Sequence, residues 1–412
     1  MVPNGWKQVD LGSLFDFKNG LNNDKEHYGS GYKFVNVMDV FGNDILTEDK
    51  IIGRVQVSDN QIVGYQLQYG DVLFNRTSET FDEIAMAAVY LDDAVATFGG
   101  FVIRGRPKSN DIYPEYSAFL FQAESYRTQA IKLGQGAVRA NIGQKDLAKV
   151  NVLLPSIEEQ NKIVHILSTW DQAISTTEKL LENSQQQKKA LMQQLLTGKK
   201  RLLDEDGVRF SESWCLVKLR DVVKIDRGFA FKSDQYKEQG MRIIRVTNLE
   251  SNGYIETVDC VYLDQGEVLE YQKYALREHD VLLVMVGATA GKLGFVTEQT
   301  LPALLNQNMW LLRSKDMNQF TQSFLKYLSQ VFIEKYLSAQ QGSARGFFTQ
   351  STFEKVTFKI PKVEEQLKIV GALDLADQEI DTLQKKLDCL KQEKKALMQQ
   401  LLTGKKRVKV AV

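Results

Sequence analysis

Two predicted loops are rich in small, polar and basic side chains, and each directly follows an apolar run that reads as a buried strand. The first is Asn75-Arg76-Thr77-Ser78-Glu79-Thr80, and the second is Met285-Val286-Gly287-Ala288-Thr289-Ala290-Gly291-Lys292. Amide, hydroxyl and cationic groups at strand ends suit a surface that approaches phosphates and base edges. Two further segments, 134–141 and 341–348, combine glycines with Arg139 and Arg345, so backbone and guanidinium can both come close to a ligand.

Residue patterns that would indicate catalysis are missing from the sequence. It has no Walker phosphate loop and no Asn-Pro-Pro-Tyr-like or Pro-Cys methylation motif, and Gly134-Gln135-Gly136 lacks the strand-glycine-helix context of a nucleotide loop. The three histidines, His27, His165 and His279, have no metal-ligand spacing and are interpreted as surface or packing residues. Asp16-Phe17-Lys18 imitates part of a nuclease motif whose upstream acidic residue is absent. The sequence therefore predicts a protein that binds and positions something else.

The elements that must position these loops are duplicated. Residues 188–201, Lys-Lys-Ala-Leu-Met-Gln-Gln-Leu-Leu-Thr-Gly-Lys-Lys-Arg, recur without change at residues 394–407. The same offset carries Pro155 onto Pro361 and Glu158-Glu159-Gln160 onto Glu364-Glu365-Gln366. Each repeat therefore ends in one long segment that begins after a proline.

Both segments are predicted to be long helices with one apolar stripe. A seven-residue frame that starts at Ile163 in the first copy and at Ile369 in the second keeps mostly apolar residues on one side, and Lys394 is the only polar member in the second. Gly198 and Gly404 supply left-handed C-terminal stops. Each helix would span about 40 residues, or roughly 60 Å, and its natural partner is the other copy in an antiparallel pair. The plainer alternative is a helix pair that only dimerises the protein or keeps its domains apart. The duplication favours instead an internal pseudo-two-fold that matches a two-fold partner such as duplex DNA.

Length and composition indicate a soluble intracellular protein of class α+β. The 52 basic and 52 acidic side chains balance, so any contact with nucleic acid must come from local patches. The three cysteines show no zinc spacing and suit a reducing cytoplasm, and no signal peptide or membrane-spanning run is evident. The predicted organisation is a first globular domain at 1–154, a helical spacer at 155–201, a second domain at 202–360, and a second spacer with a basic tail at 361–412.

This arrangement resembles the specificity subunit of type I restriction-modification systems. The resemblance covers essentially the whole chain and depends on the two Pro-x-x-Glu-Glu-Gln helices that end in Leu-Leu-Thr-Gly-Lys-Lys-Arg. It implies two target recognition domains, each reading one half of a split double-stranded DNA target, held apart by the antiparallel helices. It also implies docking of two modification subunits that methylate adenine with S-adenosylmethionine, and of restriction subunits that use ATP and Mg. The chain itself would be non-catalytic and would bind no cofactor, metal or membrane.

Within this resemblance, the residues expected to contact DNA are mainly arginine, lysine and asparagine of the strand-end loops. Arginine can pair bidentately with guanine and asparagine with adenine, although any one of them can equally contact phosphate or only solvent. The candidates are Lys18, Asn19, Asn75, Arg76, Thr77, Ser78, Arg139 and Asn141 in the first domain, and Arg227, Lys232, Thr289, Lys292, Asn308, Arg345 and Phe347 in the second. The competing hypothesis is a coiled-coil adaptor whose two domains bind protein.

Overall fold

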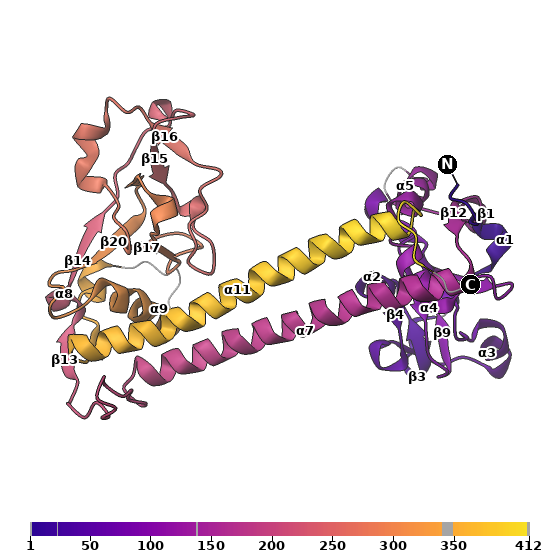
Figure 1. Ribbon diagram of the computed structural model, residues 1–412, viewed down its shortest axis with the longest axis horizontal. Helices are drawn as coiled ribbons and strands as arrows, with labels where there is room; N and C mark the ends of the chain where they lie inside the picture. Colours follow the sequence, from indigo (N-terminus) through magenta and orange to yellow (C-terminus); the bar gives the residue numbers. More distant parts are fainter. Residues whose placement is uncertain (1, 23, 137–138, 340–348, 410–412) are drawn as a thin grey trace. The chain divides into compact units, whose positions relative to one another are not determined.

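The structure is a computed structural model that describes residues 2–22, 24–136, 139–339 and 349–409. The chain separates into two compact units, Met1–Lys179 with Lys385–Val412 (unit 1) and Leu180–Gln384 (unit 2). Each unit combines a globular part of strands and short helices with portions of two long helices, α7 (Ile157–Leu195) and α11 (Val363–Leu401) (Figure 1). The predicted α+β class with two globular parts and two long helices is confirmed.

Unit 1 is built around a five-stranded sheet in which only the β4–β8 pair is parallel. Its strand order is β2 (Phe15–Asn19), β10 (Val102–Pro107), β6 (Val72–Asn75), β8 (Ala87–Tyr90) and β4 (Ile45–Leu46). The smaller sheets are β5 (Arg54–Val55) with β3 (Tyr28–Val35) and β9 (Ala96–Phe98), β1 (Lys7–Asp10) with β12 (Asn151–Leu154), and β7 (Thr77–Ser78) with β11 (Ala140–Asn141). The short helices are α1 (Leu11–Leu14), α2 (Val37–Gly42), α3 (Asp59–Tyr65), α4 (Pro114–Leu120), α5 (Glu124–Leu133) and α6 (Gln144–Leu147).

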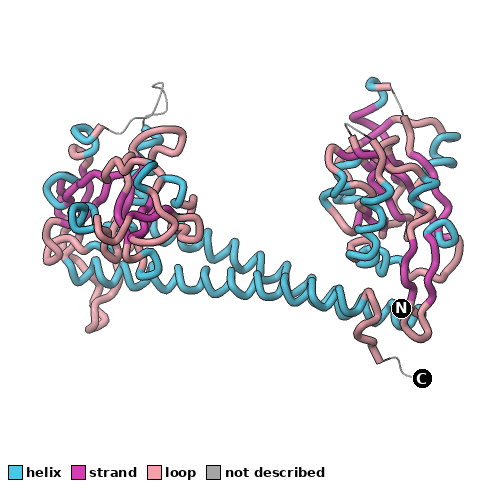
Figure 2. The backbone as a smooth tube through the Cα atoms, turned by 90° about the horizontal axis from the view of Figure 1, so that it is seen from above, coloured by secondary structure: helices cyan, strands magenta, loops and turns pink. Residues whose placement is uncertain are grey.

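Unit 2 repeats this plan with a four-stranded antiparallel sheet. Its order is β14 (Val223–Arg227), β20 (Met309–Ser314), β17 (Val281–Val284) and β18 (Leu293–Phe295). The smaller sheets are β16 (Val261–Leu263) with β15 (Met241–Ile244) and β19 (Ala303–Leu305), and β13 (Cys215–Lys218) with β21 (Thr357–Ile360). The helices are α8 (Leu219–Val222), α9 (Gln322–Ala339) and α10 (Gln350–Phe353). Figure 2 shows the strands of each unit gathered in its globular part, with short helices and loops around them.

The predicted helices outside the spacers differ between the units. The sequence predicts helices at residues 116–133 and 320–340 that pack on the sheet. The second corresponds to α9, whereas the first is divided into α4 and α5. Between those two helices the chain turns so that Phe121 packs against Phe74 and Tyr126, with both ring centroids 4.9 Å away. The aromatic side chains of these helices, including Tyr116, are buried in the core, except for Tyr336, which is half-buried.

The apolar stripe predicted for the two long helices is confirmed, because every member of the seven-residue frame is buried or half-buried. Within unit 1, Lys394 of α11 pairs with Asp171 of α7, and its ammonium lies 5.4 Å from the ring centroid of Phe119. Within unit 2, Lys188 of α7 makes the equivalent pair with Asp377 of α11. The start of each helix thus faces the end of the other, which makes the two helices antiparallel.

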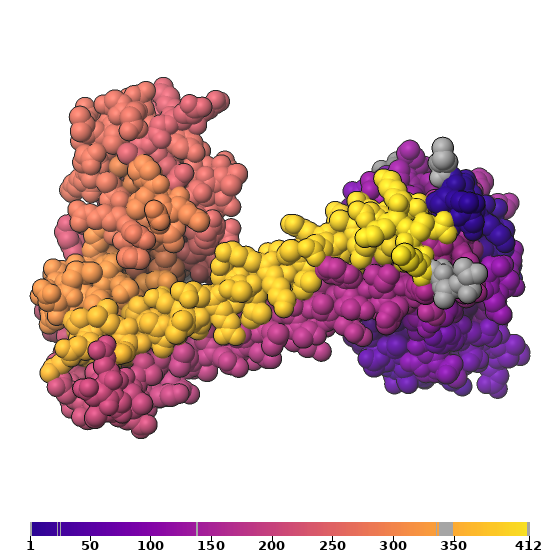
Figure 3. All heavy atoms as spheres, in the orientation of Figure 1, coloured from indigo at the N-terminus to yellow at the C-terminus, as the bar shows by residue number. Residues whose placement is uncertain are grey.

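Each helix start is joined to its own unit by a buried carboxylate. In unit 1, Glu159 accepts a hydrogen bond from Trp6 Nε1 (3.0 Å) and a bidentate pair from Arg407 (2.7 and 2.8 Å). Figure 3 shows the C-terminal residues beyond α11 lying against the N-terminal segment that carries Trp6. In unit 2, Glu365 accepts from Trp214 Nε1 (3.1 Å) and from Arg201 (2.5 and 2.7 Å). We call these two triads joint 1 and joint 2.

The glutamine of the Pro-x-x-Glu-Glu-Gln motif completes each joint. Gln160 and Gln366 are both fully buried. The Gln160 side chain accepts from Tyr113 N (2.7 Å) and donates to Asp111 O (2.9 Å), and Gln366 makes the same kind of bonds to the segment before α9. Buried polar groups must be paired, so this side chain fixes the segment that precedes α4 or α9 onto the helix start.

Candidate nucleic-acid interface

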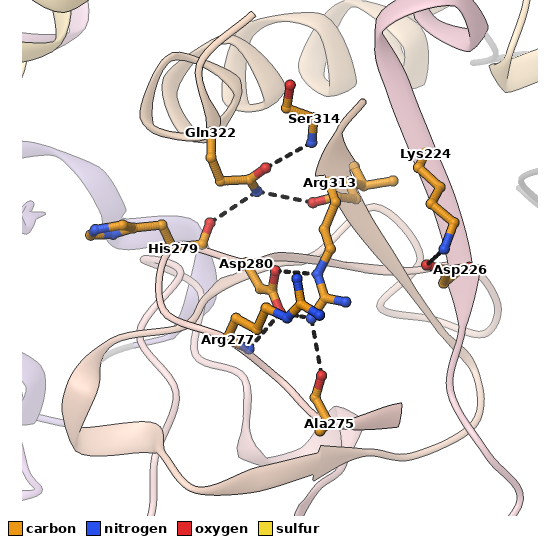
Figure 4. Close-up of polar contacts among 10 residues, drawn as sticks. Lys224, Asp226, Ala275, Arg277, His279, Asp280, Arg313, Ser314 and Gln322 are labelled. Carbon is orange, nitrogen blue, oxygen red and sulfur yellow. Dashed lines mark hydrogen bonds and ion pairs between the residues drawn. The ribbon is translucent and has the colours of Figure 1, made fainter. Parts of the chain in front are cut away.

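The turn that leads into the central strand is held by a buried ion pair in both units. In unit 2, Asp280 accepts a bidentate pair from Arg313 and a bond from Arg277 N (2.7 Å), while Arg313 also donates to Ala275 O (3.0 Å) (Figure 4). In unit 1, Asp71 and Arg106 form the same pair. The sequence of residues 67–74 and 276–283 predicts a turn that leads into a buried strand, and β6 and β17 confirm it. Each strand delivers the candidate loop to one end of the sheet.

In unit 1 the two candidate segments meet, although 64 residues separate them. Thr77 pairs with Asn141 in the β7–β11 ladder, and Thr77 Oγ1 donates to Asn141 Oδ1 (3.0 Å). Arg76 is half-buried and donates from Nη1 to Gly100 O (3.3 Å), and Arg139 is exposed beside β11. The strand-end surface of unit 1 is defined as the last residue of β2, the first residue of β10, and the loop residues beside them, Arg76, Thr77, Arg139 and Asn141.

Two candidates of this segment are used inside the unit. Asn75 is fully buried, where it donates to Glu83 O (3.1 Å) and accepts from Thr77 N (3.1 Å). Ser78 is buried and donates to the Glu83 carboxylate (2.6 Å). Both side chains thus shape the loop that presents Arg76 and Thr77.

The candidates on β2 lie at the same end of the sheet. Asn19 is exposed and pairs with Ile103 at the start of β10. Lys18 is half-buried, and its ammonium donates to Gly64 O (2.8 Å) and lies 4.2 Å from the ring centroid of Tyr65. Asn19 therefore presents an exposed amide at this end, beside the Gln144 side chain, whereas the Lys18 ammonium is engaged with α3.

In unit 2 four candidates gather at the corresponding end. Arg227 ends β14 and is exposed, with Nη2 donating to Gln350 Oε1 (3.3 Å). Asn308 immediately precedes β20 and is exposed, with φ +70°. Thr289 and Lys292 belong to the loop between β17 and β18, in which Val284 N donates to Lys292 O (2.9 Å). These four residues form the strand-end surface of unit 2.

The remaining candidates lie elsewhere. Lys232 is exposed at the start of a short 3-10 helix, Ser233–Gln235, and its backbone N–H donates to Gln235 Oε1 (3.1 Å). Arg345 and Phe347 fall outside the residues that the structure describes. Phe101, which is not among the candidates predicted from the sequence, lies beside Arg76 and is 62% exposed. The only sequence signal for it is its place just before an apolar run.

Comparisons with known proteins agree with this architecture. The family model of the type I restriction modification DNA specificity domain matches twice, over residues 3–184 and 211–392. The chain belongs to this family. Its relatives include the specificity subunit of the MjaVIII type I restriction enzyme from Methanocaldococcus jannaschii, 28% identical over 314 residues, which are 73% of this chain and 71% of the relative. The putative MjaX specificity subunit of that organism is 24% identical over 99% of this chain and 95% of its own.

A solved structure shares the fold of this specificity chain. The S subunit of a type I restriction-modification system from M. genitalium superposes with a TM-score of 0.56 over 98% of both chains, at 16% identity. Among the described residues no helix has the length and apolar character needed to cross a membrane, and no group of three or more His, Cys, Asp or Glu side chains has the arrangement of a metal site.

Each unit of the specificity chain also has a groove beside its long helices, of about 1090 Å³ in unit 2 and about 1020 Å³ in unit 1. In both grooves one part of the lining comes from the duplicated segment. The paired lining residues are Lys188 and Lys394, Lys189 and Lys395, Met192 and Met398, Gln193 and Gln399, Thr197 and Thr403, and Lys199 and Lys405.

Beside the unit 2 groove, a buried tyrosine is held by two aspartates. Burial, followed by hydrogen bonds to Asp374 and Asp377, raises the pKa of Tyr327 well above its ordinary value. The phenol therefore stays protonated, and the two carboxylates, which both lie within hydrogen-bond distance of its oxygen, share its single proton. Lys188 and Lys326 neutralise this acidic pair from either side.

Proposed function

We propose that each unit reads one half of a split double-stranded DNA target through its strand-end surface, and that the two halves are separated by unread base pairs. The observation that carries this proposal is the convergence of candidates from separate segments at one sheet end in each unit. In unit 1 the side chains of Thr77 and Asn141 touch there, and in unit 2 Arg227, Lys292 and Asn308 border the same end. Amide and guanidinium groups grouped on a fixed backbone are the chemistry that direct readout of base edges requires.

The chain is proposed to be non-catalytic and to act in the cytoplasm as part of a larger assembly. Adenine methylation with S-adenosylmethionine would be carried out by modification subunits, and restriction subunits would use ATP and Mg. The family membership supports this division of labour. The competing hypothesis, a coiled-coil adaptor for proteins, is separated from it by salt, because binding through several phosphates weakens steeply as the salt concentration rises.

The test of the proposed function is to co-express the chain with its modification subunit and to map adenine methylation across the host genome by single-molecule sequencing. We expect one split motif with two short defined halves and a fixed gap. A stable complex that methylates no such motif would contradict DNA reading and favour the adaptor.

Replacing Arg76 with alanine is expected to relax the motif in one half-site only. A bidentate contact to guanine contributes about 1–3 kcal/mol of discrimination, which corresponds to roughly a 5- to 150-fold change in relative affinity. Arg54→Ala is the matched control, because Arg54 is also a unit 1 arginine with one backbone bond, to Gly31 O (2.8 Å), but lies away from the strand-end surface. Equal loss on unrelated sequences would reassign Arg76 to phosphate binding.

We also propose that two modification subunits bind, one in each groove. Six exposed positions are identical in the two duplicated segments even though exposure removes any packing reason for identity. These positions are Lys189 and Lys395, Ala190 and Ala396, Gln193 and Gln399, Gln194 and Gln400, Lys199 and Lys405, and Lys200 and Lys406. Three of these pairs, at Lys189, Gln193 and Lys199 with their copies, line the grooves. Two copies of one partner surface would therefore meet identical residues in each groove, as a pseudo-two-fold assembly requires.

Charge reversal in the grooves is therefore expected to remove partner copies one at a time. Lys189→Glu or Lys395→Glu alone should leave one modification subunit bound, and the double variant should leave none, because each reversal places a carboxylate where the partner meets an ammonium. Native mass spectrometry of the complex measures this count. Lys179→Glu, an exposed change on α7 that lies outside the groove linings, is the control and should retain two. Two copies retained by the double variant would exclude the grooves as the docking sites.

A further inference from the structure

Phe101 and Asn308 occupy the same structural position in the two units. Phe101 directly precedes β10, whose Val102 pairs with Asn75, and Asn308 directly precedes β20, whose Met309 pairs with Val284. The backbone bond is also the same. Arg76 N donates to Phe101 O (2.9 Å), and Met285 N donates to Asn308 O (3.1 Å). The position is therefore set by the register of the two central strands in each sheet.

The backbone around this position is tightly held in both units. In unit 1, Gly20 N donates to Val102 O (3.1 Å) and Gly100 N to Leu21 O (2.8 Å). In unit 2, Gly228 N donates to Met309 O (3.2 Å) and Gln307 N to Phe229 O (2.8 Å). The side chain at this position thus projects from a fixed backbone, which is what a specificity contact needs.

The two side chains differ in chemistry but not in accessibility. Asn308 is exposed, and its left-handed φ of +70° is one that asparagine tolerates. Phe101 is 62% exposed, next to the guanidinium that donates to Gly100 O. A single exposed apolar side chain is ordinary on a protein surface. Phe101 differs from such ordinary surface residues in two ways. The equivalent residue in unit 2 is Asn308, whose amide can hydrogen-bond to a base, and Phe101 has Arg76 as its neighbour.

We propose that this position reads one base in each half-site, with Phe101 contacting the C5-methyl group of a thymine and Asn308 the hydrogen-bonding edge of an adenine. This inference rests on the proposed function and extends it from a surface to a named base contact. In the major groove the thymine methyl is recognised by apolar groups, including phenylalanine, and adenine by asparagine. The unit 1 half-site would accordingly contain a thymine whose methyl group is required.

The experiment uses the complex with the modification subunit and a duplex that carries the motif found by methylation mapping. Each thymine of the half-site assigned to unit 1 is replaced in turn by deoxyuridine, which removes only the methyl group, and binding is measured by fluorescence anisotropy. With the native chain, one replacement should weaken binding about three- to tenfold, the size expected for one buried methyl group. With Phe101→Ala the same replacement should have no effect, and Phe101→Leu should restore part of it.

Asn308→Gly provides the matched variant in unit 2, since glycine accepts the left-handed backbone. It should relax an adenine position in the other half-site and leave the deoxyuridine effect unchanged. A unit 1 half-site without thymine, or equal deoxyuridine effects in the native chain and Phe101→Ala, would overturn the assignment of Phe101. If a split motif is still read in that case, the proposed function stands, whereas loss of all sequence preference in the native complex would reject the proposed function itself.

Discussion

Replacing Glu365 with glutamine is expected to destabilise unit 2 by about 3 kcal/mol, because it leaves the Arg201 guanidinium with no charged partner. The Glu365 side chain is 3% exposed and that of Arg201 is 19% exposed. A carboxylate accepts from three donors here, the two Arg201 nitrogens and Trp214 Nε1. A glutamine would turn its NH2 group toward one of these N–H groups, so that at least one donor would lose its acceptor.

The matched control is Glu159→Gln in joint 1, where the same change should cost less than half as much. Arg407 is 42% exposed and can turn its guanidinium toward water, which Arg201 cannot do as easily. Amide hydrogen exchange measures both variants locally. A loss of about 3 kcal/mol corresponds to roughly a hundredfold faster exchange in the first turns of α11. Equal effects in the two joints would show that burial of the arginine does not decide the cost.

The long helices could be predicted from the sequence because their signals are local and repeated. A seven-residue period, a glycine stop and an unbroken run each lie within the helix itself, and the structure confirms the stripe and both glycine ends, with Gly198 at φ +70° and Gly404 at φ +67°. The duplication also identified the partner helix. Periodicity alone does not show which helix packs against another. Because this chain contains two copies of the same helix, each copy is the natural partner of the other.

The role of the Pro-x-x-Glu-Glu-Gln motif could not be predicted in the same way. Glu365 meets Trp214 and Arg201, which precede it by 151 and 164 residues, and no spacing rule connects such distant positions. The spacing of Ser156 and Glu159 predicts a capping box at the start of α7. Ser156 Oγ does accept from Glu159 N (3.3 Å), but the Glu159 carboxylate is committed to Trp6 and Arg407. Tertiary pairing determined the use of this side chain.

A local capping motif also starts a helix where the sequence predicts a strand. The composition of residues 34–39 predicts a β-rich run, yet β3 ends at Val35 and α2 begins at Val37. Asn36 and Asp39 form a capping box, in which Asn36 N donates to the Asp39 carboxylate (2.7 Å), and this starts a helix inside an apolar run. The pattern of an asparagine followed three residues later by an acidic residue was the available signal.

The sequence identified the segments that carry the candidate residues, but not how those segments meet. Thr77 and Asn141 lie at one end of a sheet because β7 pairs with β11, and no local pattern predicts a pairing between residues 64 apart. Deciding that Asn75 and Ser78 face inward, while Phe101 faces outward, needs the register of β6 against β10 and the position of Glu83, and these follow from packing. A shift of one residue in a strand exchanges its two faces, so composition cannot settle this.

Each strand-end surface depends on one glycine, Gly20 directly after β2 or Gly228 directly after β14. These glycines lie against the turns that precede Phe101 and Asn308. A Cβ atom on Gly20 would lie 2.1 Å from Gly99 O, and one on Gly228 would lie 1.8 Å from Asn306 O. Both contacts are with backbone, which cannot move aside as a flexible side chain would. Gly20→Ala is therefore expected to force β2 away from the turn before β10, and Gly228→Ala should force β14 away from the turn before β20. Each substitution should lower the stability of its own unit by about 3 kcal/mol.

The functional consequence should be confined to one half-site for each substitution. Gly20→Ala displaces the turn that carries Phe101 and should erase the unit 1 half of the methylated motif, while Gly228→Ala displaces Asn308 and should erase the other half. Gly42→Ala is the control in unit 1, because its added Cβ meets no atom within 4 Å. Methylation mapping of the three variants measures the outcome. Loss of both halves in either glycine variant would mean that the substitution disrupts the assembly as a whole, since a displaced turn in one unit leaves the strand-end surface of the other intact.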